Sequence, residues 1–571
     1  MDILININKL NKQTCLTYKN KNIYIFGNII AYLNDTGDGE LSYNTNDILL
    51  NCPNNISYED YLKNIIHGFI GKFAVLIVDN NCESYNLFNS YSSPGLYIFE
   101  EEGCINITSN EKIVFKKFVN KNGLTPSLIE DYLTGNHLSF REPFSFFGSY
   151  VRLPGGHELK FYKTTCSIEN INSLLKEHYI EYNDIDLINK LHINLKNIII
   201  AYKKHFSTLN LAFSGGLDSS IILAIIKELG FQANSYFIEY SGKNQVDSLL
   251  AHQISAYLNQ DIEFIPGSSS KVTEEVFDKY MRSGFFQLNN MKYIFNPSIN
   301  SFYLNEKNII TGQNADSIYA IDTFLPQTEL IGVERLKNVT LNTDNRKYYS
   351  EDFLYENIYT TELKQEGLIN LCKHYFNNIE HEHVNITIKS FTNSNNNQRL
   401  RNRHLFPDLI KKILEYSKNR NLTSTLRYIK ILRNNINTAQ NYNEMGRFSN
   451  LNRICPFNEG PIYHLFANYK LKIFDLLSPK TLFELLFNKI TNNSHRELTE
   501  NVMRNKEFKK NNIISKYDHD FVNKNLINDR LQYISNKLDK FVRSYSFKDY
   551  TKYINNNPAR LMNLAYLMED V

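Results

Sequence analysis

Over the first 165 residues, hydrophobic positions come in short runs that polar clusters interrupt. β-branched and aromatic side chains dominate four of these runs, at residues 21–33, 71–79, 84–90 and 95–99. Asn, Asp and Gly separate the runs, which is typical of strands joined by turns. An interval with helical spacing at 127–136 precedes another strand-like segment at 151–161. The pattern predicts a layered α+β unit over residues 1–165.

The pattern changes near residue 185. Residues 184–206 repeat their apolar positions about every three or four residues, which predicts an amphipathic helix. Strand-like and helix-like runs then alternate: "LNLAF", "SSIILAIIKELG", "SYFIEY", "VDSLLAHQISAYL" and "IEFIP". This alternation predicts an α/β unit with a doubly wound parallel sheet over 185–571. Less regular residues at about 323–430 indicate an insertion.

Composition narrows the class of protein. The 571 residues are enough for two to four domains, and 63 Lys and Arg against 60 Asp and Glu leave a net charge of +3. This balance points to no nucleic-acid or membrane partner. The seven cysteines are scattered singly, without a CxxC pair, which argues against a zinc site or a disulfide framework. With no signal peptide and no apolar stretch of about 18 residues, we expect a cytoplasmic protein.

One turn between a predicted strand and a predicted helix has the composition of an anion site. It has the sequence Ser214, Gly215, Gly216, Leu217, Asp218, Ser219 and Ser220. The glycines allow close approach of a ligand, and the helix N-terminus with the serine hydroxyls would cradle an oxyanion. Asp218 adds a carboxylate suited to Mg²⁺ bound to phosphates. The chain has no GxxxxGK[ST] loop, and a turn used only for packing is the alternative interpretation.

The SGGLDSS turn resembles the pyrophosphate loop of enzymes that split ATP between its α and β phosphates. Four later segments resemble asparagine synthetases and their relatives, in the family's order, at residues 310–320, 451–469, 478–487 and 502–510. In the N-terminal part, "GKFAVLIVD", "SSPGLYIF", "ITSNEK" and "VRLPGGHELKF" resemble the class II glutaminase (Ntn-like) fold. The resemblance implies a glutaminase-like unit at 1–165 and an ATP-pyrophosphatase (synthetase) unit at 185–571.

The resemblance also implies cofactors and site residues. ATP and Mg²⁺ are the expected cofactors, with Asp218 and Asp316 as the metal ligands. Lys506 matches the lysine that contacts phosphate and the developing oxyanion, and Lys480 lies in a segment that resembles a further family element. Gln313 occupies a catalytic position of the family with a different residue type. The implied contacts to ATP and pyrophosphate come from residues 214–220 together with Leu211, Phe237 and Gly312.

Two departures from the family bear on activity. A class II glutaminase needs cysteine as its first mature residue, whereas Asp2 follows Met1 here and the nearest cysteine is Cys15. We therefore expect no glutamine hydrolysis. Gln313 stands where asparagine synthetases have Glu and β-lactam synthetases have Tyr, so the base that deprotonates the amine is not carried over.

These features predict an AMP-forming amide-bond synthetase that acts on a peptide or small-molecule carboxylate. Because glutamine-derived ammonia is not expected as the nucleophile, we expect closure onto an amine already on the substrate. We favour a lasso-peptide macrolactam cyclase, which would act beside a leader-peptide protease, because Gln313 replaces the Tyr of the β-lactam synthetases and the locally basic extra segment would suit a long peptide. The alternatives are an enzyme like the β-lactam synthetases or another small-molecule amide ligase, and an ammonia-dependent asparagine synthetase. An enzyme acting on tRNA would need an RNA-binding module, and the sequence shows no basic domain of that kind. A non-catalytic ATP-binding partner is a further alternative.

Overall fold

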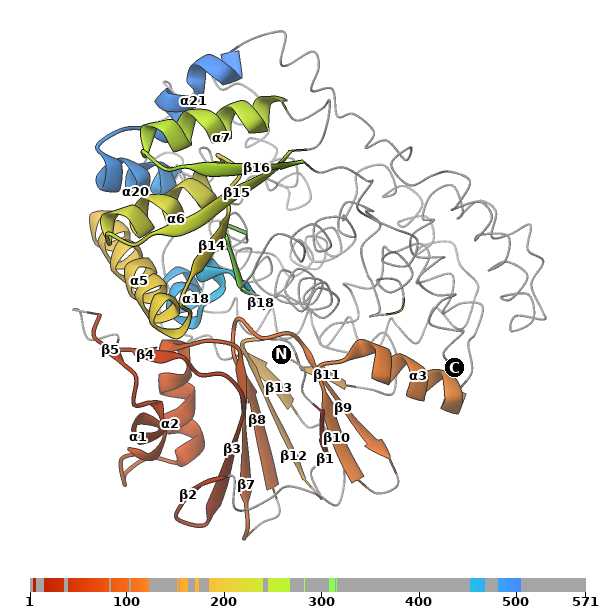
Figure 1. The fold of residues 1–571 in the computed structure, drawn as a ribbon. Helices are drawn as coiled ribbons and strands as arrows, with labels where there is room; N and C mark the ends of the chain where they lie inside the picture. The colour runs from red at the N-terminus through yellow and green to blue at the C-terminus, as the bar shows by residue number, and fades with distance from the viewer. Residues whose placement is uncertain are drawn as a thin grey trace, which may run out of the picture.

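The computed structural model of the chain describes residues 4–6, 15–34, 39–81, 84–101, 104–122, 151–153, 155–162, 170–173, 184–239, 245–266, 282, 308–313, 315, 452–467 and 481–504. These residues form two groups of strands: antiparallel sheets in the N-terminal part, and one parallel sheet in the later part (Figure 1). The structure is therefore mixed α/β, as expected. The helical interval at 127–136 and the insertion at 323–430 lie outside the described residues.

The N-terminal part contains three antiparallel sheets. The larger sheet has the order β13 (Asn170–Ser173), β12 (His157–Tyr162), β8 (Ser84–Asn89), β7 (Phe73–Asp79), β3 (Lys21–Gly27) and β2 (Leu16–Tyr18). The second has the order β1 (Leu4–Asn6), β10 (Cys104–Thr108), β9 (Leu96–Glu101) and β11 (Val151–Leu153). A small sheet joins β5 (Leu41–Ser42), β4 (Ala31–Leu33) and β6 (Phe69–Ile70). The strands expected from the short hydrophobic runs are thus confirmed.

The two larger antiparallel sheets share a core. Leu76 and Leu87 of one sheet pack in the same cluster as Ile98 and Ile107 of the other. The helices of this part are α1 (Thr45–Leu50), α2 (Tyr58–Ile65), the short 3-10 helix η3 (Ile66–Gly68) and α3 (Glu111–Asn122). The described N-terminal part thus combines antiparallel sheets with helices.

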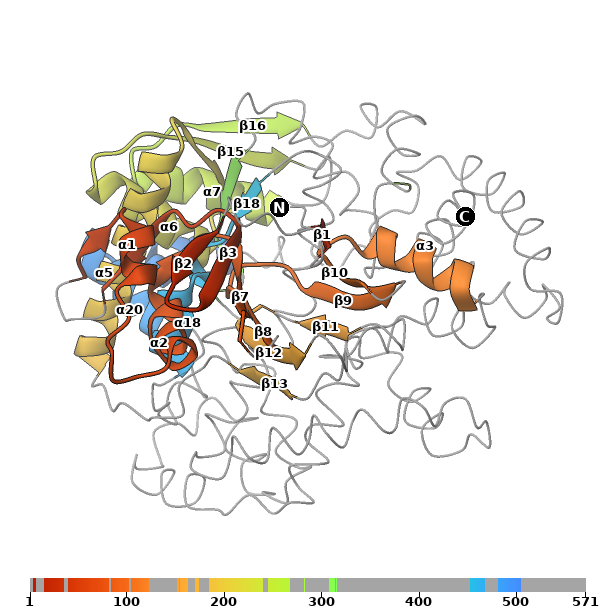
Figure 2. The same ribbon diagram turned by 90° about the horizontal axis from the view of Figure 1, so that it is seen from below.

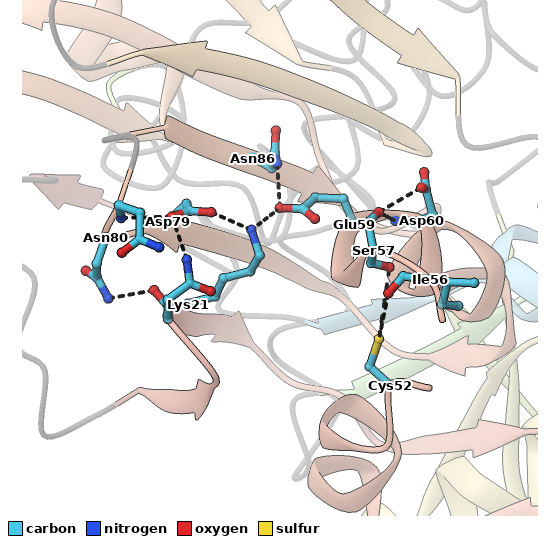
Figure 3. A network of polar contacts seen from close by, with 11 residues as sticks. Lys21, Cys52, Ile56, Ser57, Glu59, Asp60, Asp79, Asn80 and Asn86 are labelled. Atoms are coloured by element: carbon cyan, nitrogen blue, oxygen red, sulfur yellow. Dashed lines mark hydrogen bonds and ion pairs between the residues drawn. The ribbon is translucent and has the colours of Figure 1, made fainter. Parts of the chain in front are cut away.

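A polar network attaches α2 to the larger antiparallel sheet (Figure 3). The Lys21 Nζ atom of β3 lies 2.7 Å from Glu59 Oε1 of α2 and 2.7 Å from Asp79 Oδ2 of β7. Asn86 of β8 also donates to Glu59 Oε1, at 3.3 Å. Ser57 caps the helix by accepting the N–H of Asp60 at 3.1 Å. One ammonium group bridges the two carboxylates and offsets part of their charge, so we assign the network a structural role.

The parallel sheet has the order β16 (Ile262–Pro266), β15 (Ala233–Glu239), β14 (Leu209–Ala212), β17 (Asn308–Thr311) and β18 (Asn452–Ile454). Every adjacent pair is parallel. Its helices are α5 (Asp184–His205), α6 (Leu217–Glu228), α7 (Gln245–Tyr257), η8 (Pro456–Asn458), α18 (Gly460–Ala467), α20 (Thr481–Thr491) and α21 (His495–Arg504). The helix expected at 184–206 is confirmed as α5. The strand order reverses beside β14, as is typical of doubly wound sheets.

The two groups of sheets pack directly against each other. α18 contacts η3 and β6 on one side and α5 on the other, and both views show it where the two groups meet (Figure 1 and Figure 2). The rings of Tyr91 and Tyr463 stack at 5.4 Å, and those of His67 and His464 at 3.9 Å. At Gly460 a Cβ atom would lie 2.4 Å from the His67 carbonyl oxygen, so only glycine permits this close approach.

None of the helices in the described ranges combines the length and apolar character needed to cross a bilayer.

Candidate functional site

The candidate site lies where the strand order of the parallel sheet reverses. β15 and β16 extend the sheet from one side of β14, whereas β17 and β18 extend it from the other. Ala212 and Thr311, the last residues of β14 and β17, are register partners. The turns that follow these two strands therefore start side by side at the carboxyl edge. Ligands of open α/β sheets bind in such a crevice.

The turn after β14 requires glycine at its second position. Gly215 has φ +72°, and a Cβ atom there would lie 2.4 Å from the Ala251 backbone nitrogen of α7. Gly216 is the N-cap of α6, with an extended backbone at φ −70° and ψ 155°. The left-handed glycine thus turns the chain sharply from β14 into α6, against the backbone of α7.

Serine side chains hold the turn in this shape. The Ser219 hydroxyl donates to the Gly216 carbonyl at 3.0 Å and accepts from the Ser214 N–H at 3.3 Å. The Ser220 hydroxyl donates to the same carbonyl at 2.9 Å. Ser219 and Ser220 are buried, whereas Ser214 is exposed. Of the three predicted anion-binding hydroxyls, Ser214 alone faces solvent, and the other two stabilise the turn itself.

The turn after β17 touches the first turn of α6. A Cβ atom at Gly312 would lie 2.6 Å from the Ser219 backbone nitrogen and 2.8 Å from the Asp218 carbonyl carbon. Gly312 therefore lies against this backbone, and Gln313 follows it directly. The Gln313 Oε1 atom is buried and accepts no hydrogen bond from the described residues. The structure thus brings together Asp218, Gly312 and Gln313, which lie far apart in the sequence.

This edge has the chemistry of an anion site. The first-turn N–H groups of α6 have no acceptor within the helix, and the positive end of the helix dipole lies there. A left-handed glycine before a helix also directs successive N–H groups to one side. Asp218, in the first turn of α6, adds a carboxylate that fits a Mg²⁺ ligand. Asp316, Lys480 and Lys506 lie outside the described residues.

The two remaining residues of the expected ATP contacts have buried side chains. Leu211 of β14 is fully buried, and Phe237 of the adjacent strand β15 packs its ring 5.6 Å from that of Phe264. Both belong to the main hydrophobic core. A nucleotide at this edge would therefore meet their backbone groups, because their side chains are engaged in packing.

Sequence reasoning missed a histidine that contacts the turn. His495, the first residue of α21, places Nε2 at 2.9 Å from the Gly215 carbonyl oxygen. The two residues are 280 positions apart, and a single histidine at the start of a helix carries no motif. Only the fold brings them together.

A buried carboxylate joins the N-terminal sheets to the parallel sheet. Glu459 Oε2 accepts from the Gly71 N–H at 2.9 Å and from the Ser92 hydroxyl at 3.3 Å, and Oε1 accepts from the Tyr202 hydroxyl at 2.5 Å. Burial raises the pKa of Glu459, although these donors and the Lys72 ammonium oppose the shift. Glu459 is thus a hydrogen-bonded junction between segments far apart in sequence.

Lys72 reaches the edge strand of the parallel sheet from the N-terminal part. Its Nζ atom donates to Asn452 Oδ1 of β18 at 3.3 Å. The side chain is only partly exposed. Burial lowers the pKa of its ammonium group, and the nearby Cys455 and Glu459 oppose this shift. Lys72 thus adds a second polar contact across the same boundary.

Comparison with protein-family models finds no match to this chain, and no curated protein is significantly similar to it in sequence.

Proposed function

We propose that this chain is an ATP-dependent, AMP-forming amide-bond synthetase with a glutaminase-like N-terminal unit and an ATP-pyrophosphatase unit. One observation carries the proposal: the SGGLDSS turn opens a helix at the strand-order reversal of a parallel sheet, with Gly312 packed on its backbone. This location and this turn suit a diphosphate. The Asp218 carboxylate beside them suits the cation that accompanies one.

The proposed reaction has two steps. A carboxylate oxygen of the substrate attacks the α-phosphorus of ATP, and the bond from that phosphorus to the departing pyrophosphate breaks. An amine then attacks the acyl carbon, the amide C–N bond forms, the amine loses a proton and AMP leaves. The turn at 214–220 would bind pyrophosphate through backbone N–H groups and the exposed Ser214 hydroxyl.

The metal and lysine roles in this proposal follow the resemblance. Mg²⁺ held by Asp218 and Asp316 would offset the charge of the departing pyrophosphate. Lys506 and Lys480 would contact the phosphates and the developing oxyanion. Gln313 borders the turn, where its amide would orient a bound substrate through hydrogen bonds.

The proposed substrate is a peptide that supplies both the carboxylate and the amine. Because glutamine-derived ammonia is not the nucleophile we expect, we place the attacking amine on the substrate itself. Lasso-peptide cyclases use such a nucleophile when they close a macrolactam.

Two measurements test this function. Calorimetric titration with Mg·ATP should detect binding to the full chain. Mass spectrometry should then detect ATP-dependent loss of one water from a leader-cleaved precursor peptide encoded beside the gene. Asp218→Ala should reduce turnover about 100-fold or more. Asp261→Ala is the control, because this exposed carboxylate precedes β16 at the opposite edge of the sheet.

Each result has a distinct meaning. Absence of Mg·ATP binding by the unaltered chain would refute the ATP-dependent activity. Binding without exchange of labelled pyrophosphate into ATP, in the presence of such peptides, would refute peptide adenylation. Full turnover by Asp218→Ala would show that the carboxylate has no part in the reaction.

A further inference from the structure

His495 contacts the SGGLDSS turn with a defined geometry. The His495 side chain is 7% exposed, and its ring packs edge-on against Phe487 at 5.4 Å. Its Nε2 atom lies 2.9 Å from the Gly215 carbonyl oxygen. A carbonyl oxygen only accepts hydrogen bonds, so Nε2 carries the proton and donates it.

A carboxylate lies near the other nitrogen of the imidazole ring. Glu484 of α20 places Oε1 at 3.9 Å from His495 Nδ1. The other carboxylate oxygen of Glu484 accepts the Arg496 backbone N–H at 3.2 Å. Glu484 therefore spans α20 and the first turn of α21, and it faces the side of the ring opposite the Gly215 contact.

The hydrogen bond determines which way one peptide group of the turn faces. In a trans peptide the C=O and N–H bonds point in opposite directions. With the Gly215 carbonyl held toward α21, the Gly216 N–H points the other way, toward the Ser214 hydroxyl at 3.3 Å. That hydroxyl belongs to the exposed residue of the turn. The N–H, which donates to this hydroxyl, therefore points toward the exposed side of the turn.

Glycine makes this orientation easy to lose. A peptide flanked by two glycines has few steric barriers to rotation, and a flipped Gly215–Gly216 peptide would present its carbonyl oxygen to the anion. An oxygen lone pair repels phosphate, whereas an N–H group binds it. The hydrogen bond from His495 to the Gly215 carbonyl stabilises the observed orientation of this peptide over the flipped one.

We propose that His495 is a positioning residue that holds the Gly215–Gly216 peptide with its N–H group toward the bound diphosphate. This inference rests on the proposed function, because it assigns His495 to the same anion site. His495 acts through the backbone of the turn and does not touch the ligand.

Two substitutions of His495 distinguish the contribution of its N–H donor from that of its aromatic ring. His495→Phe keeps an aromatic ring against Phe487 but lacks an N–H donor, and His495→Gln keeps a donor on a flexible side chain. Titration with Mg·pyrophosphate and Mg·ATP should show about tenfold weaker binding to His495→Phe, with most of the affinity recovered in His495→Gln. His192→Phe is the matched control, because His192 is 9% exposed and bonds Glu228 at the far end of α6.

The outcomes distinguish the two proposals. If the unaltered chain binds neither ligand, the proposed function fails, and the positioning role fails with it. If the unaltered chain binds both and His495→Phe binds equally well, the positioning role alone is wrong. Equal losses in the Phe and Gln variants would also overturn it, because the donor would then be irrelevant. Should His495→Phe fail to fold, His495→Met, which also lacks an N–H donor, replaces it with the same expectations.

Discussion

Gly312→Ala tests the contact between the two turns of the candidate site. The added Cβ atom would lie 2.6 Å from the Ser219 backbone nitrogen, where ordinary contact begins at 3.4 Å. The nearest atoms belong to the backbone and have no side-chain rotamer to relieve the clash. The first turn of α6 or the end of β17 must therefore move by about 0.8 Å, the difference between these two distances.

This displacement has two expected costs. Overpacking of this kind destabilises a protein by about 1–3 kcal/mol. A shift of about 0.8 Å also takes a hydrogen bond of about 2.9 Å out of range, and losing a hydrogen bond to a charged group costs about 1.5–3 kcal/mol, which is about tenfold to 100-fold in affinity. We therefore expect Gly312→Ala to weaken Mg·ATP binding by about tenfold to 100-fold.

Calorimetric titration with Mg·ATP, together with thermal unfolding, measures both effects. Gly230→Ala is the matched control, because Gly230 has φ +69° but no atom within 4 Å of the added Cβ. It should lose about 1 kcal/mol of stability through its left-handed backbone and keep its affinity for Mg·ATP. Unchanged affinity in Gly312→Ala would refute the contact. Equal losses of affinity in both variants would show that general destabilisation, and not the turn, controls binding.

Two further predictions concern stability. Glu459→Ala removes the acceptor of the Gly71 N–H and the Tyr202 hydroxyl. Urea titration should therefore show a free energy of unfolding lower by about 2–6 kcal/mol, with a smaller loss in Glu459→Gln. A Glu459→Ala variant as stable as the unaltered chain would contradict this. Burial lowers the pKa of His192 below 6.5, although Glu228 opposes this shift. On acidification the unfolded chain therefore takes up more protons than the folded chain, so the stability of the fold should decrease as the pH drops below about 6.5. In His192→Gln the urea midpoint should change less between pH 7.5 and pH 5.5 than it does in the unaltered chain. An equal change in both proteins would show that His192 does not cause the pH dependence.

Much of the local structure was predictable from the sequence. Apolar run lengths and turn residues indicate β3, β7, β8 and β9 because a strand buried in a sheet needs consecutive or alternating apolar side chains, whatever lies elsewhere in the chain. The SGGLDSS turn is recognisable for a similar reason. Its glycines and serines act within the turn itself, where Ser219 and Ser220 bond the Gly216 carbonyl.

The partners of that turn depend on long-range packing. Gly312 was predicted as a site residue only through a resemblance, and its contact with the Ser219 backbone arises because β17 lies beside β14. His495 was missed altogether. Its hydrogen bond to Gly215 spans 280 positions, and no local pattern encodes a contact of that range.

The sequence by itself determined the strands, the helix at 184–206 and the turn with the composition of an anion site, because each depends on interactions between residues close together in the chain. The tertiary structure alone decided that this turn lies at the reversal of strand order, that Gly312 and His495 contact it, and that Glu459 joins the two groups of sheets. Those contacts form only when distant segments pack, since their free energy comes from burial and hydrogen bonds between elements that no local spacing specifies.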